Sequence, residues 1–322
     1  MVEEICEPST QVSTVGEALV VFTPELPGPL DLISGLAKSV GGAEVNVAVG
    51  LARLGHSVRW MGRVGEDPFG RQIQRTLLAE QVDSCVILDP VRPTGVCFRQ
   101  LSAAGQHNAY HYRSGSAASV LSASEISRRA DWLLDTRIVH LTGITPALSA
   151  ACHAATVELL REAGARGVPV SFDATISVEL LGELSASELL HPLMRGSRIV
   201  FMSSMAAQTL FGADEVDVLG QARDKLNIGV LVVHDATGAR AVHRHGVDSV
   251  AAHRVTVIDP LGAGDAFVAG YLAGWLRSDS VAECLQMATL CAASAVTTKG
   301  DYLQSAASSG RHSLDVFAAR VR

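Results

Sequence analysis

Two glycines and two aspartates late in the chain have a spacing that suits phosphoryl transfer. Residues 259–265 read Asp-Pro-Leu-Gly-Ala-Gly-Asp and lie between the apolar run 255–258 and a helical pattern. In a tight turn from strand to helix, the backbone N–H groups of Gly262, Ala263 and Gly264 can converge on an anion. The positive end of the following helix adds to that attraction. The segment therefore predicts an anion site at the start of a helix.

Asp265 is the group in this segment that can move a proton. A carboxylate beside the anion site can accept the proton of an attacking hydroxyl while the backbone amides hold the phosphoryl group in line. The simpler interpretation is a helix N-cap, because Asp in a turn flanked by glycine is common at that position. Taken alone, the segment leaves both interpretations open.

A second glycine-rich segment, residues 41–48, opens a helix of Ala, Val and Leu that ends near Gly55. Gly41 and Gly42 allow a ligand to approach the backbone closely. Asn46, one turn into the helix, presents both a donor and an acceptor, which hydroxyl-rich ligands need. The alternative is close helix packing through small side chains with Gly55 as the C-cap, which explains Gly55 well and Asn46 poorly.

Composition and charge narrow the class of protein. The chain has 322 residues, 48% of them hydrophobic, and a formal net charge of -7, which suits a soluble enzyme of one elaborate domain or two. The 26 Lys and Arg against 33 Asp and Glu are scattered, so we expect no nucleic-acid partner. A small anionic ligand would need only a local pocket.

Targeting and metal signals are weak. Residues 1–7 are acidic and lack the order of a secretory signal, and no apolar stretch approaches a membrane span, so we expect a cytoplasmic protein. The cluster His243, His245 and His253 lies in a polar stretch typical of a hairpin, without acidic or Cys partners, and metal binding there is the less favoured interpretation. Six cysteines without a Cys-x-x-Cys pair are expected to be buried thiols: Cys6, Cys85, Cys97, Cys152, Cys284 and Cys291.

Short β-rich runs alternate with helical patterns along most of the chain, which predicts a mainly parallel sheet covered by helices, with ligands at the carboxyl ends of its strands. The expected strands are 57–64, 137–142, 168–173, 197–201 and 230–234, and two of the expected helices are 147–163 and 282–297. Two segments, about 17–38 and 94–116, read instead as strands and turns. They predict a small β-lid over the edge of the sheet.

The two glycine-rich segments together resemble those of the ribokinase-like, PfkB-type sugar kinases. That family has Gly-Gly-Ala-x-x-Asn-x-Ala at a helix start near the N-terminus and Asp-x-x-Gly-Ala-Gly-Asp late in the chain, and both motifs occur here in that order. The likeness covers almost the whole chain and is closest to the 2-keto-3-deoxygluconate kinases. Supporting stretches are 16–17, 62–70, 112–118 and 141–149.

The resemblance implies a single ribokinase-like α/β domain over residues 1–322, with helices on both faces of the sheet and an inserted β-lid. It implies ATP-dependent phosphorylation of a sugar or sugar acid at a primary hydroxyl, with Mg²⁺. Asp265 would be the base and residues 262–264 the anion hole, while Asp259 would belong to a loop that often holds a monovalent cation such as K⁺. Sugar contacts would come from Gly41, Gly42, Asn46 and Arg113.

The expected sugar side departs from the family pattern. Cys97 and His111 stand where related kinases carry two lid tyrosines, and residues 173–177 read Asp-Ala-Thr-Ile-Ser where the pattern ends in Arg. One of two expected carboxylate-binding arginines is therefore missing. Arg113 alone can still pair with a carboxylate, a bond that contributes ~1.5–3 kcal/mol. A sugar acid is the first choice, and a neutral ketose such as fructose or an altered aldonic acid is the alternative.

The expected nucleotide side departs further. Residues 203–206 lack the usual Glu, 234–236 replace a usual Lys-x-Gly, and a helix Asn is replaced by Thr. The residues expected around the nucleotide are Ser203, His234, Gly238 and Thr289. Mg²⁺ can be held largely by water and the ATP phosphates, so the losses favour a slow kinase, another phosphate donor, or a catalytically weakened homologue that only binds.

Retention of Asp265 with its whole glycine turn argues against a pure sensor, which has no chemical need for a base. A nicotinamide dehydrogenase is disfavoured because Phe267 occupies the third glycine position of its fingerprint.

Because lid strands often leave unpaired edges, we also expect a homo-oligomer, as a dimer through the lid.

Overall fold

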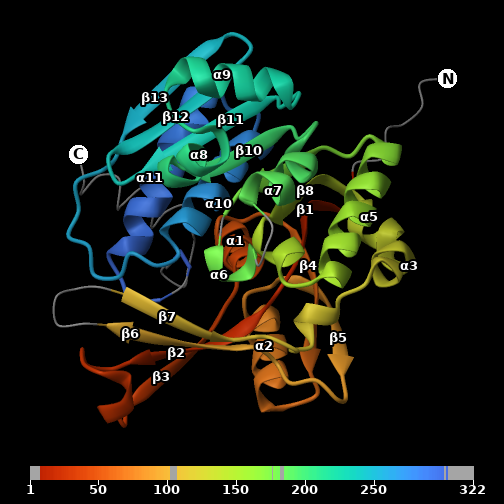
Figure 1. Cartoon of the computed structure of the whole chain (residues 1–322), viewed down its shortest axis with the longest axis vertical. Coiled ribbons are helices and arrows are strands. Elements are labelled where there is room, and N and C mark those ends of the chain that lie inside the picture. Colours follow the sequence, from red (N-terminus) through yellow and green to blue (C-terminus); the bar gives the residue numbers. More distant parts are fainter. Residues whose placement is uncertain (1–7, 102–106, 176, 182–184, 301, 304–322) are drawn as a thin grey trace.

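The computed structural model of the chain describes residues 8–101, 107–175, 177–181, 185–300 and 302–303 (Figure 1). The predicted features of residues 1–7, Cys6 among them, and part of the 94–116 segment lie outside these ranges. Within them the chain forms a large sheet wrapped by helices and a second, smaller sheet beside it. The mainly parallel architecture predicted from the alternating pattern is confirmed.

Nine strands of the described residues form the large sheet. In order across it they are β13 (Gly246–Ala251), β12 (Gly238–His243), β11 (Val230–Asp235), β10 (Ile199–Ser203), β9 (Val170–Asp173), β8 (Thr136–Thr142), β1 (Thr10–Val15), β4 (Val58–Gly65) and β5 (Asp83–Asp89). The strands from β11 to β5 pair in parallel, whereas β12 and β13 are antiparallel. The bounds of the five expected strands 57–64, 137–142, 168–173, 197–201 and 230–234 lie within two residues of those of observed strands.

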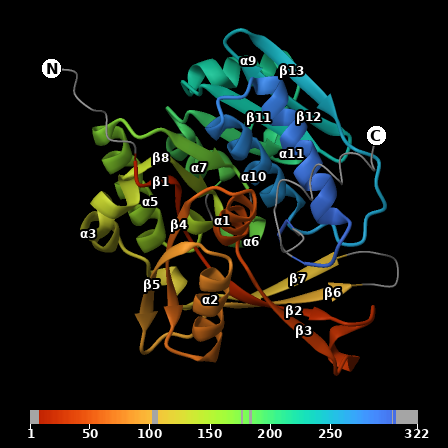
Figure 2. The same ribbon diagram turned by 180° about the vertical axis from the view of Figure 1, so that it is seen from behind.

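Helices cover both faces of this sheet, as Figures 1 and 2 show. One face carries α3 (Ala123–Leu134), α5 (Ala150–Arg166), α7 (Ala186–Met194), α8 (Ser204–Phe211) and α9 (Val216–Lys225). The other carries α1 (Ala43–Arg53), α2 (Pro68–Ala79), α10 (Ala263–Leu276) and α11 (Val281–Val296). Short helical turns are η1 (Leu30–Leu32), η2 (Ala118–Val120), α4 (Ile144–Ala147) and α6 (Val178–Leu181).

Alternation along the strands divides the core into two layers. In β10, Ile199 and Phe201 pack against α10 and α11, while Val200 and Met202 pack on the opposite side. Successive side chains of a strand point to opposite faces, so a strand apolar at every position is buried on both. This explains why these strands read as continuous apolar runs.

The second sheet contains β3 (Leu36–Gly41), β2 (Leu19–Pro24), β6 (Val96–Leu101) and β7 (His107–Tyr112), in that order. It lies below the large sheet in Figure 1, next to α2 and facing the end of α10 and α11. One of its faces is aromatic, with the rings of Phe22 and Phe98 stacked at 4.8 Å. The opposite face carries alternate residues of β6 and β7, among them Cys97 and its cross-strand partner His111.

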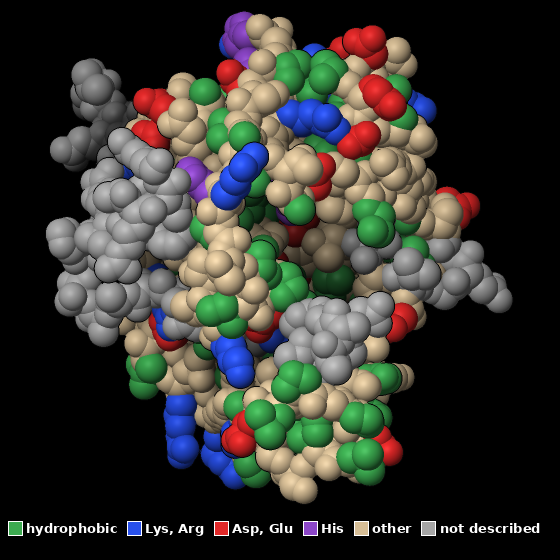
Figure 3. Space-filling model, turned by 90° about the vertical axis from the view of Figure 1, so that its left-hand side faces the viewer, with side chains coloured by type: hydrophobic (Ala, Val, Ile, Leu, Met, Phe, Trp, Pro, Cys, Tyr) green, Lys and Arg blue, Asp and Glu red, His purple; other side chains and the backbone are tan. Residues whose placement is uncertain are grey.

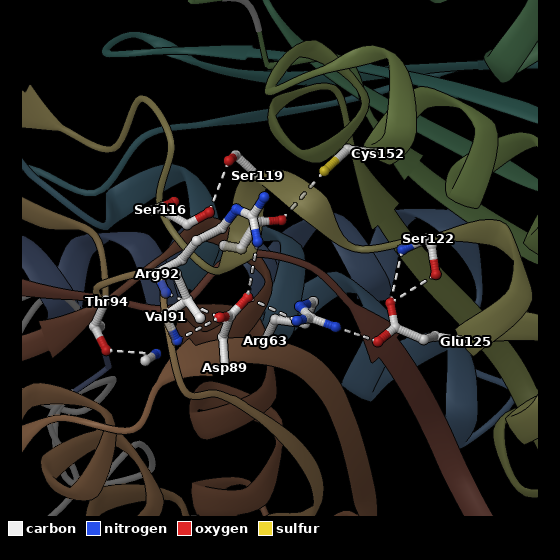
Figure 4. Close-up of polar contacts among 12 residues, drawn as sticks. Arg63, Asp89, Val91, Arg92, Thr94, Ser116, Ser119, Ser122, Glu125 and Cys152 are labelled. Carbon is white, nitrogen blue, oxygen red and sulfur yellow. Dashed lines mark hydrogen bonds and ion pairs between the residues drawn. The ribbon is translucent and has the colours of Figure 1, made fainter.

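An ion-pair network holds the turn between β5 of the large sheet and β6 of the second sheet (Figure 4). Arg63 of β4 donates hydrogen bonds to Asp89 at the end of β5, at 2.7 Å, and to Glu125 in the first turn of α3. Asp89 also accepts the backbone N–H groups of Val91 and Arg92, at 2.9 Å each. These bonds fix the turn that leads into β6.

One predicted strand is absent. Residues 252–258 form no regular element, and Val257 and Ile258 are more than half exposed. Their backbone is held instead by Ile258 and Asp259, whose N–H groups donate to the carbonyl of Val296. The expected strand-to-helix turn is therefore a loop-to-helix turn. The prediction was wrong because a short apolar run can equally line a cavity, as Val255 and Val257 do.

The structure shows the surroundings of the cysteines and of the histidine cluster. Four described cysteines are buried and Cys85 is partly exposed, all as free thiols. His243 has an acidic neighbour that the sequence did not suggest, since its Nε2 lies 3.0 Å from Asp248 across the β12–β13 hairpin. No group of three potential metal ligands occurs in the described residues. Nor does any described helix combine the length and apolar character that a membrane crossing requires.

Candidate active site

The two glycine-rich segments meet in space. Gly42 is the N-cap of α1 at a φ of 137°, and a Cβ there would lie 2.3 Å from the backbone oxygen of Glu17. Only glycine permits this close crossing of the chain. The crossing places Asn46, whose Nδ2 donates a 2.7 Å hydrogen bond to Oδ2 of Asp265 in α10. Residues 219 positions apart in the sequence therefore share one site.

The turn before α10 has the geometry of an anion site rather than of an Asp cap. Gly262 is the N-cap residue, with a left-handed φ of 75°, and no side chain caps the helix. Asp265 lies in the first helical turn and bonds Asn46 instead. The N-cap interpretation of Asp265 is therefore wrong. The N–H groups at the start of the helix stay available to a ligand beside its carboxylate.

The Asp265 carboxylate lies in an acidic environment. Its pKa is raised to about 8, chiefly by burial and also by the nearby carboxylates of Asp173 and Glu44, against the lowering effects of Asn46 and Arg99. An elevated pKa near neutrality suits a general base, because such a group accepts a proton strongly while remaining partly ionised.

Glu44 and Asp173 line the floor behind Asp265. The Glu44 side chain is fully buried, and its Oε1 accepts hydrogen bonds from the hydroxyls of Thr142 (2.7 Å) and Thr145 (2.6 Å). Asp173 ends β9, and burial raises its pKa to about 6. Thr142 ends β8, so the carboxyl ends of two neighbouring parallel strands contribute to the site, as the fold rule predicts. Figure 3 shows a hollow with acidic side chains visible inside it.

Several buried polar atoms near Asn46 have no hydrogen-bond partner within the described part of the chain. They include Glu17 Oε1, Asn46 Oδ1, Arg113 Nε, Ser116 Oγ and His111 Nδ1. Three of these side chains surround Gly95, where an added Cβ would lie 3.2 to 3.7 Å from Glu17, Arg113 and Ser116. Buried polar groups cost free energy unless they are paired. A ligand rich in hydroxyl groups would satisfy them.

Arg113 is present on the expected sugar side, but it already has a counterion. Its Nη1 lies 3.1 Å from Oε2 of Glu17, and both side chains are largely buried. Burial raises the pKa of Glu17 more than the charge of Arg113 lowers it, so that the pKa is about 7. His111 is 4.0 Å from Glu179, and burial lowers its pKa to about 4, so its imidazole is neutral at pH 7.

A cavity of about 800 Å³ opens on the other side of the Gly262 turn. His234 lines it, stacked on Phe267 at 4.6 Å, together with Gly238 and Thr289. Ala263 and Gly264 form its inner end. Three of the four residues expected around the nucleotide thus share one cavity.

Ser203 does not line that cavity. Its hydroxyl accepts the N–H of Ala206 at 3.0 Å and caps α8, while the neighbouring Ser204 donates to Asp235. Ser203 is the last residue of β10. A hydroxyl in that position satisfies its own helix first.

Asp259 is buried and has three partners. Its Oδ1 accepts the N–H of Leu261 at 3.1 Å, its Oδ2 lies 3.5 Å from the N–H of Gly300, and Nη1 of Arg99 is 3.7 Å from Oδ2. A guanidinium therefore supplies positive charge beside the loop for which a monovalent cation is expected. Arg99 comes from β6 of the second sheet, and sequence reasoning did not single it out.

Comparisons with known proteins agree with this geometry. The family model of the pfkB family carbohydrate kinases matches residues 9–307. A 2-dehydro-3-deoxygluconokinase of Thermoproteus tenax is 30% identical over 305 residues, covering 93% of this chain and 92% of the relative. A fructokinase of Escherichia coli is 32% identical over 308 residues, covering 91% and 95%.

Solved structures give the same result. A PfkB protein from a Polaromonas species superposes with a TM-score of 0.82 at 30% identity, covering 91% of this chain and 98% of that one. A putative ribokinase II from Escherichia coli, solved in complex with ATP and Mg²⁺, has a TM-score of 0.87 at 24% identity, covering 97% and 99%. The latter likeness concerns the fold alone.

The fold and the family match define a ribokinase-like carbohydrate kinase. The chain belongs to the pfkB family. It is a sugar kinase, for which ATP and Mg²⁺ are the expected phosphate donor and metal.

Proposed function

We propose that this kinase transfers the terminal phosphoryl group of ATP to a primary hydroxyl of a sugar acid similar to 2-keto-3-deoxygluconate. The observation that carries the proposal is the 2.7 Å contact between Asn46 and Asp265, which joins the sugar-binding segment to the base. Asp265 accepts the hydroxyl proton, and the backbone amides of residues 262–264 stabilise the charge on the transferring group.

The cavity next to α10 fits the nucleotide. Its volume of about 800 Å³ lies in the range of ligand sites, and its walls include the apolar Val255, Val257 and Phe267. Ala263 and Gly264 at its inner end would hold the phosphates through backbone N–H groups. ATP supplies the phosphoryl group when bound.

Magnesium fits less directly. No cluster of three acidic, His or Cys ligands exists in the described residues. Mg²⁺ commonly keeps several waters and binds through few carboxylates plus substrate phosphates, which is the arrangement this site can accommodate. A K⁺ ion at the Asp259 loop stays a prediction.

The sugar acid is supported by Arg113, by the 2-dehydro-3-deoxygluconokinase relatives and by the unpaired polar atoms on the expected sugar side. One observation favours a second candidate, a neutral ketose such as fructose. Glu17 already neutralises Arg113 at 3.1 Å, and a paired guanidinium attracts a carboxylate less. The fructokinase relatives are compatible with this alternative.

We further propose that the whole chain acts as one ribokinase-like domain in which the second sheet serves as a lid over the acceptor site. The polar face of β6 and β7 carries Cys97 and His111 on the expected sugar side. A dimer through the exposed edges of this sheet, and a cytoplasmic location, remain predictions of the sequence.

The testing experiment is a panel assay of nucleotide consumption with 2-keto-3-deoxygluconate, related sugar acids, fructose and ribose, with and without Mg²⁺. We expect Mg²⁺-dependent turnover with a sugar acid and slower turnover with neutral sugars. A reversed order would select the ketose. Binding of sugar or nucleotide by thermal shift, without turnover on any acceptor, would contradict the catalytic proposal.

A further inference from the structure

Arg99 reaches into the site from the second sheet. It lies on the same face of β6 as Cys97, because residues two apart on a strand point the same way. Its side chain is 12% exposed, and its Nη1 is 3.7 Å from Oδ2 of Asp259. The cross-strand partner of Arg99 is Ala109, which is small and exposed. On the facing strand, only a methyl group therefore stands beside Arg99.

The charge of Arg99 acts on both ends of the loop that contains the anion hole. It pairs with Asp259 at the start of the loop, and its charge lowers the pKa of Asp265 at the end. The turn that starts at Gly262 lies between these two carboxylates. The guanidinium therefore acts electrostatically on the carboxylates at both ends of the turn.

Asp259 does not depend on Arg99 for its position. Its carboxylate accepts the N–H of Leu261 and faces that of Gly300. The 3.7 Å separation from Arg99 is longer than a direct hydrogen bond. When a more negative group arrives at the turn, Arg99 can turn toward it without leaving the carboxylate of Asp259 unsolvated.

The nucleotide side lacks a cation at the usual position. His234 lines the cavity where the family pattern has Lys, and burial lowers its pKa to about 4, so it carries no charge at pH 7. Arg254 also lines the cavity, but in the loop on its nucleotide side. Arg99 instead approaches the loop from β6 of the second sheet, where it pairs with Asp259.

We propose that Arg99 binds the transferring phosphoryl group, exchanging its contact with Asp259 for phosphoryl oxygens when the second sheet closes over the sugar. The planar guanidinium matches phosphoryl oxygens in a bidentate way. The inference rests on the proposed function, and it makes closure of the second sheet a condition for catalysis, because the stabilising charge arrives with β6.

The test compares a nucleotide that has the terminal phosphate with one that lacks it. Dissociation constants for ADP and for a non-hydrolysable ATP analogue are measured by calorimetry, with Mg²⁺ and with 2-keto-3-deoxygluconate present to close the second sheet, for the parent and for Arg99→Met and Arg99→Lys. We expect Arg99→Met to weaken the analogue about 10-fold or more with little change for ADP, since a charge-assisted contact contributes at least one such factor. Arg99→Lys should fall between, because it keeps the charge without the fork.

Lys38→Met is the matched control. Lys38 is an exposed cation of the same sheet, on β3, with its ammonium 6.0 Å from the Phe69 ring, and its loss should leave both constants unchanged. Equal weakening of ADP and the analogue by Arg99→Met, or no weakening, overturns the inference. Selective loss of the analogue in a protein that phosphorylates no sugar contradicts the proposed function alone, and a parent that binds neither nucleotide contradicts both.

Discussion

The side-chain amide of Asn46 donates a 2.7 Å hydrogen bond to the carboxylate of Asp265, which ties the first turn of α1 to the first turn of α10. These helices pack closely because small residues face each other. A Cβ added to Gly50 of α1 would lie 2.8 Å from the Cβ of Ala269 in α10. Helix spacing therefore sets the geometry of the site.

Gly50→Ala should disturb that spacing. A Cβ at 2.8 Å from another Cβ forces the helices apart, so we expect a loss of ~1–3 kcal/mol in unfolding free energy and a lower kcat from the altered Asn46–Asp265 contact. Urea denaturation and initial rates measure both. Gly164→Ala is the matched control in α5, where no atom lies within 4 Å of the new Cβ; it should stabilise the protein slightly. Equal effects of the two would refute the packing argument.

Arg63→Met should lower the unfolding free energy by breaking the ion pairs that hold the turn between β5 and β6. It leaves the carboxylates of Asp89 and Glu125 without their guanidinium, and removing one partner of a buried pair costs ~3–5 kcal/mol. Arg161→Met is the control, because Arg161 pairs with Glu158 and Glu162 at the surface, where an ion pair contributes little to stability. Denaturant midpoints at one pH compare them. Similar midpoints would mean that the network contributes no more than a surface pair.

The Arg63 network also has a pH signature. Backbone hydrogen bonds, mainly from Arg92, and the Arg63 guanidinium hold the pKa of Asp89 well below its usual range. A carboxyl with a depressed folded pKa contributes stability above its unfolded pKa, and that contribution is lost as pH falls. We therefore expect the stability difference between parent and Arg63→Met to shrink from pH 6 to pH 3. A difference that grows over this interval would contradict the assignment.

The buried carboxyl groups of the site make the unfolding free energy change with pH in the opposite direction above pH 6. Burial raises the pKa of Asp173 to about 6, of Glu17 to about 7 and of Asp265 to about 8. The folded state then holds protons that the unfolded state has released, so the unfolding free energy falls as pH rises from 6 to 8. Asp265→Asn should lose less stability over this range in ligand-free protein. Urea denaturation at several pH values measures this. The same decrease in unfolding free energy from pH 6 to 8 in both proteins would contradict the prediction.

Glu17→Gln should change the preference between a sugar acid and fructose in opposite directions for the two substrate candidates. It removes the counterion that lies 3.1 Å from Arg113. If Arg113 binds a sugar-acid carboxylate, the freed guanidinium should raise kcat/KM for the acid relative to fructose. If a neutral ketose donates its hydroxyl groups to Glu17, fructose turnover should fall instead. Arg113→Ala is the companion variant, which should weaken a sugar acid more than a neutral sugar of equal size; equal losses would exclude carboxylate recognition.

The sequence predicted those parts of the molecule that local pattern determines. Strands such as β9 and β10 are short apolar runs bounded by turns, and glycines at 42 and 262 mark backbone conformations that other residues rarely adopt. The proximity of Asn46 and Asp265 followed from two motifs and the family resemblance. Asp173, at the carboxyl end of β9, lies where the rule for parallel sheets places ligands.

Other features depend on contacts between distant segments. Nothing near Arg99 in the sequence indicates Asp259, because the pair forms only when β6 joins the second sheet and that sheet faces α10. The pairing of Glu17 with Arg113 is likewise a product of the fold. The apolar run 255–258 was misjudged because exposure on a cavity wall leaves the same residue pattern as burial in a sheet.

The most direct test of the account is the turnover of Asp265→Asn on the preferred sugar. The amide oxygen can still accept the hydrogen bond from Asn46, so shape and sugar affinity should be kept while proton acceptance is lost. We predict a kcat at least ~10²-fold lower with a modest change in the KM for sugar. An Asn variant as active as the parent would contradict the assignment of Asp265 as the base.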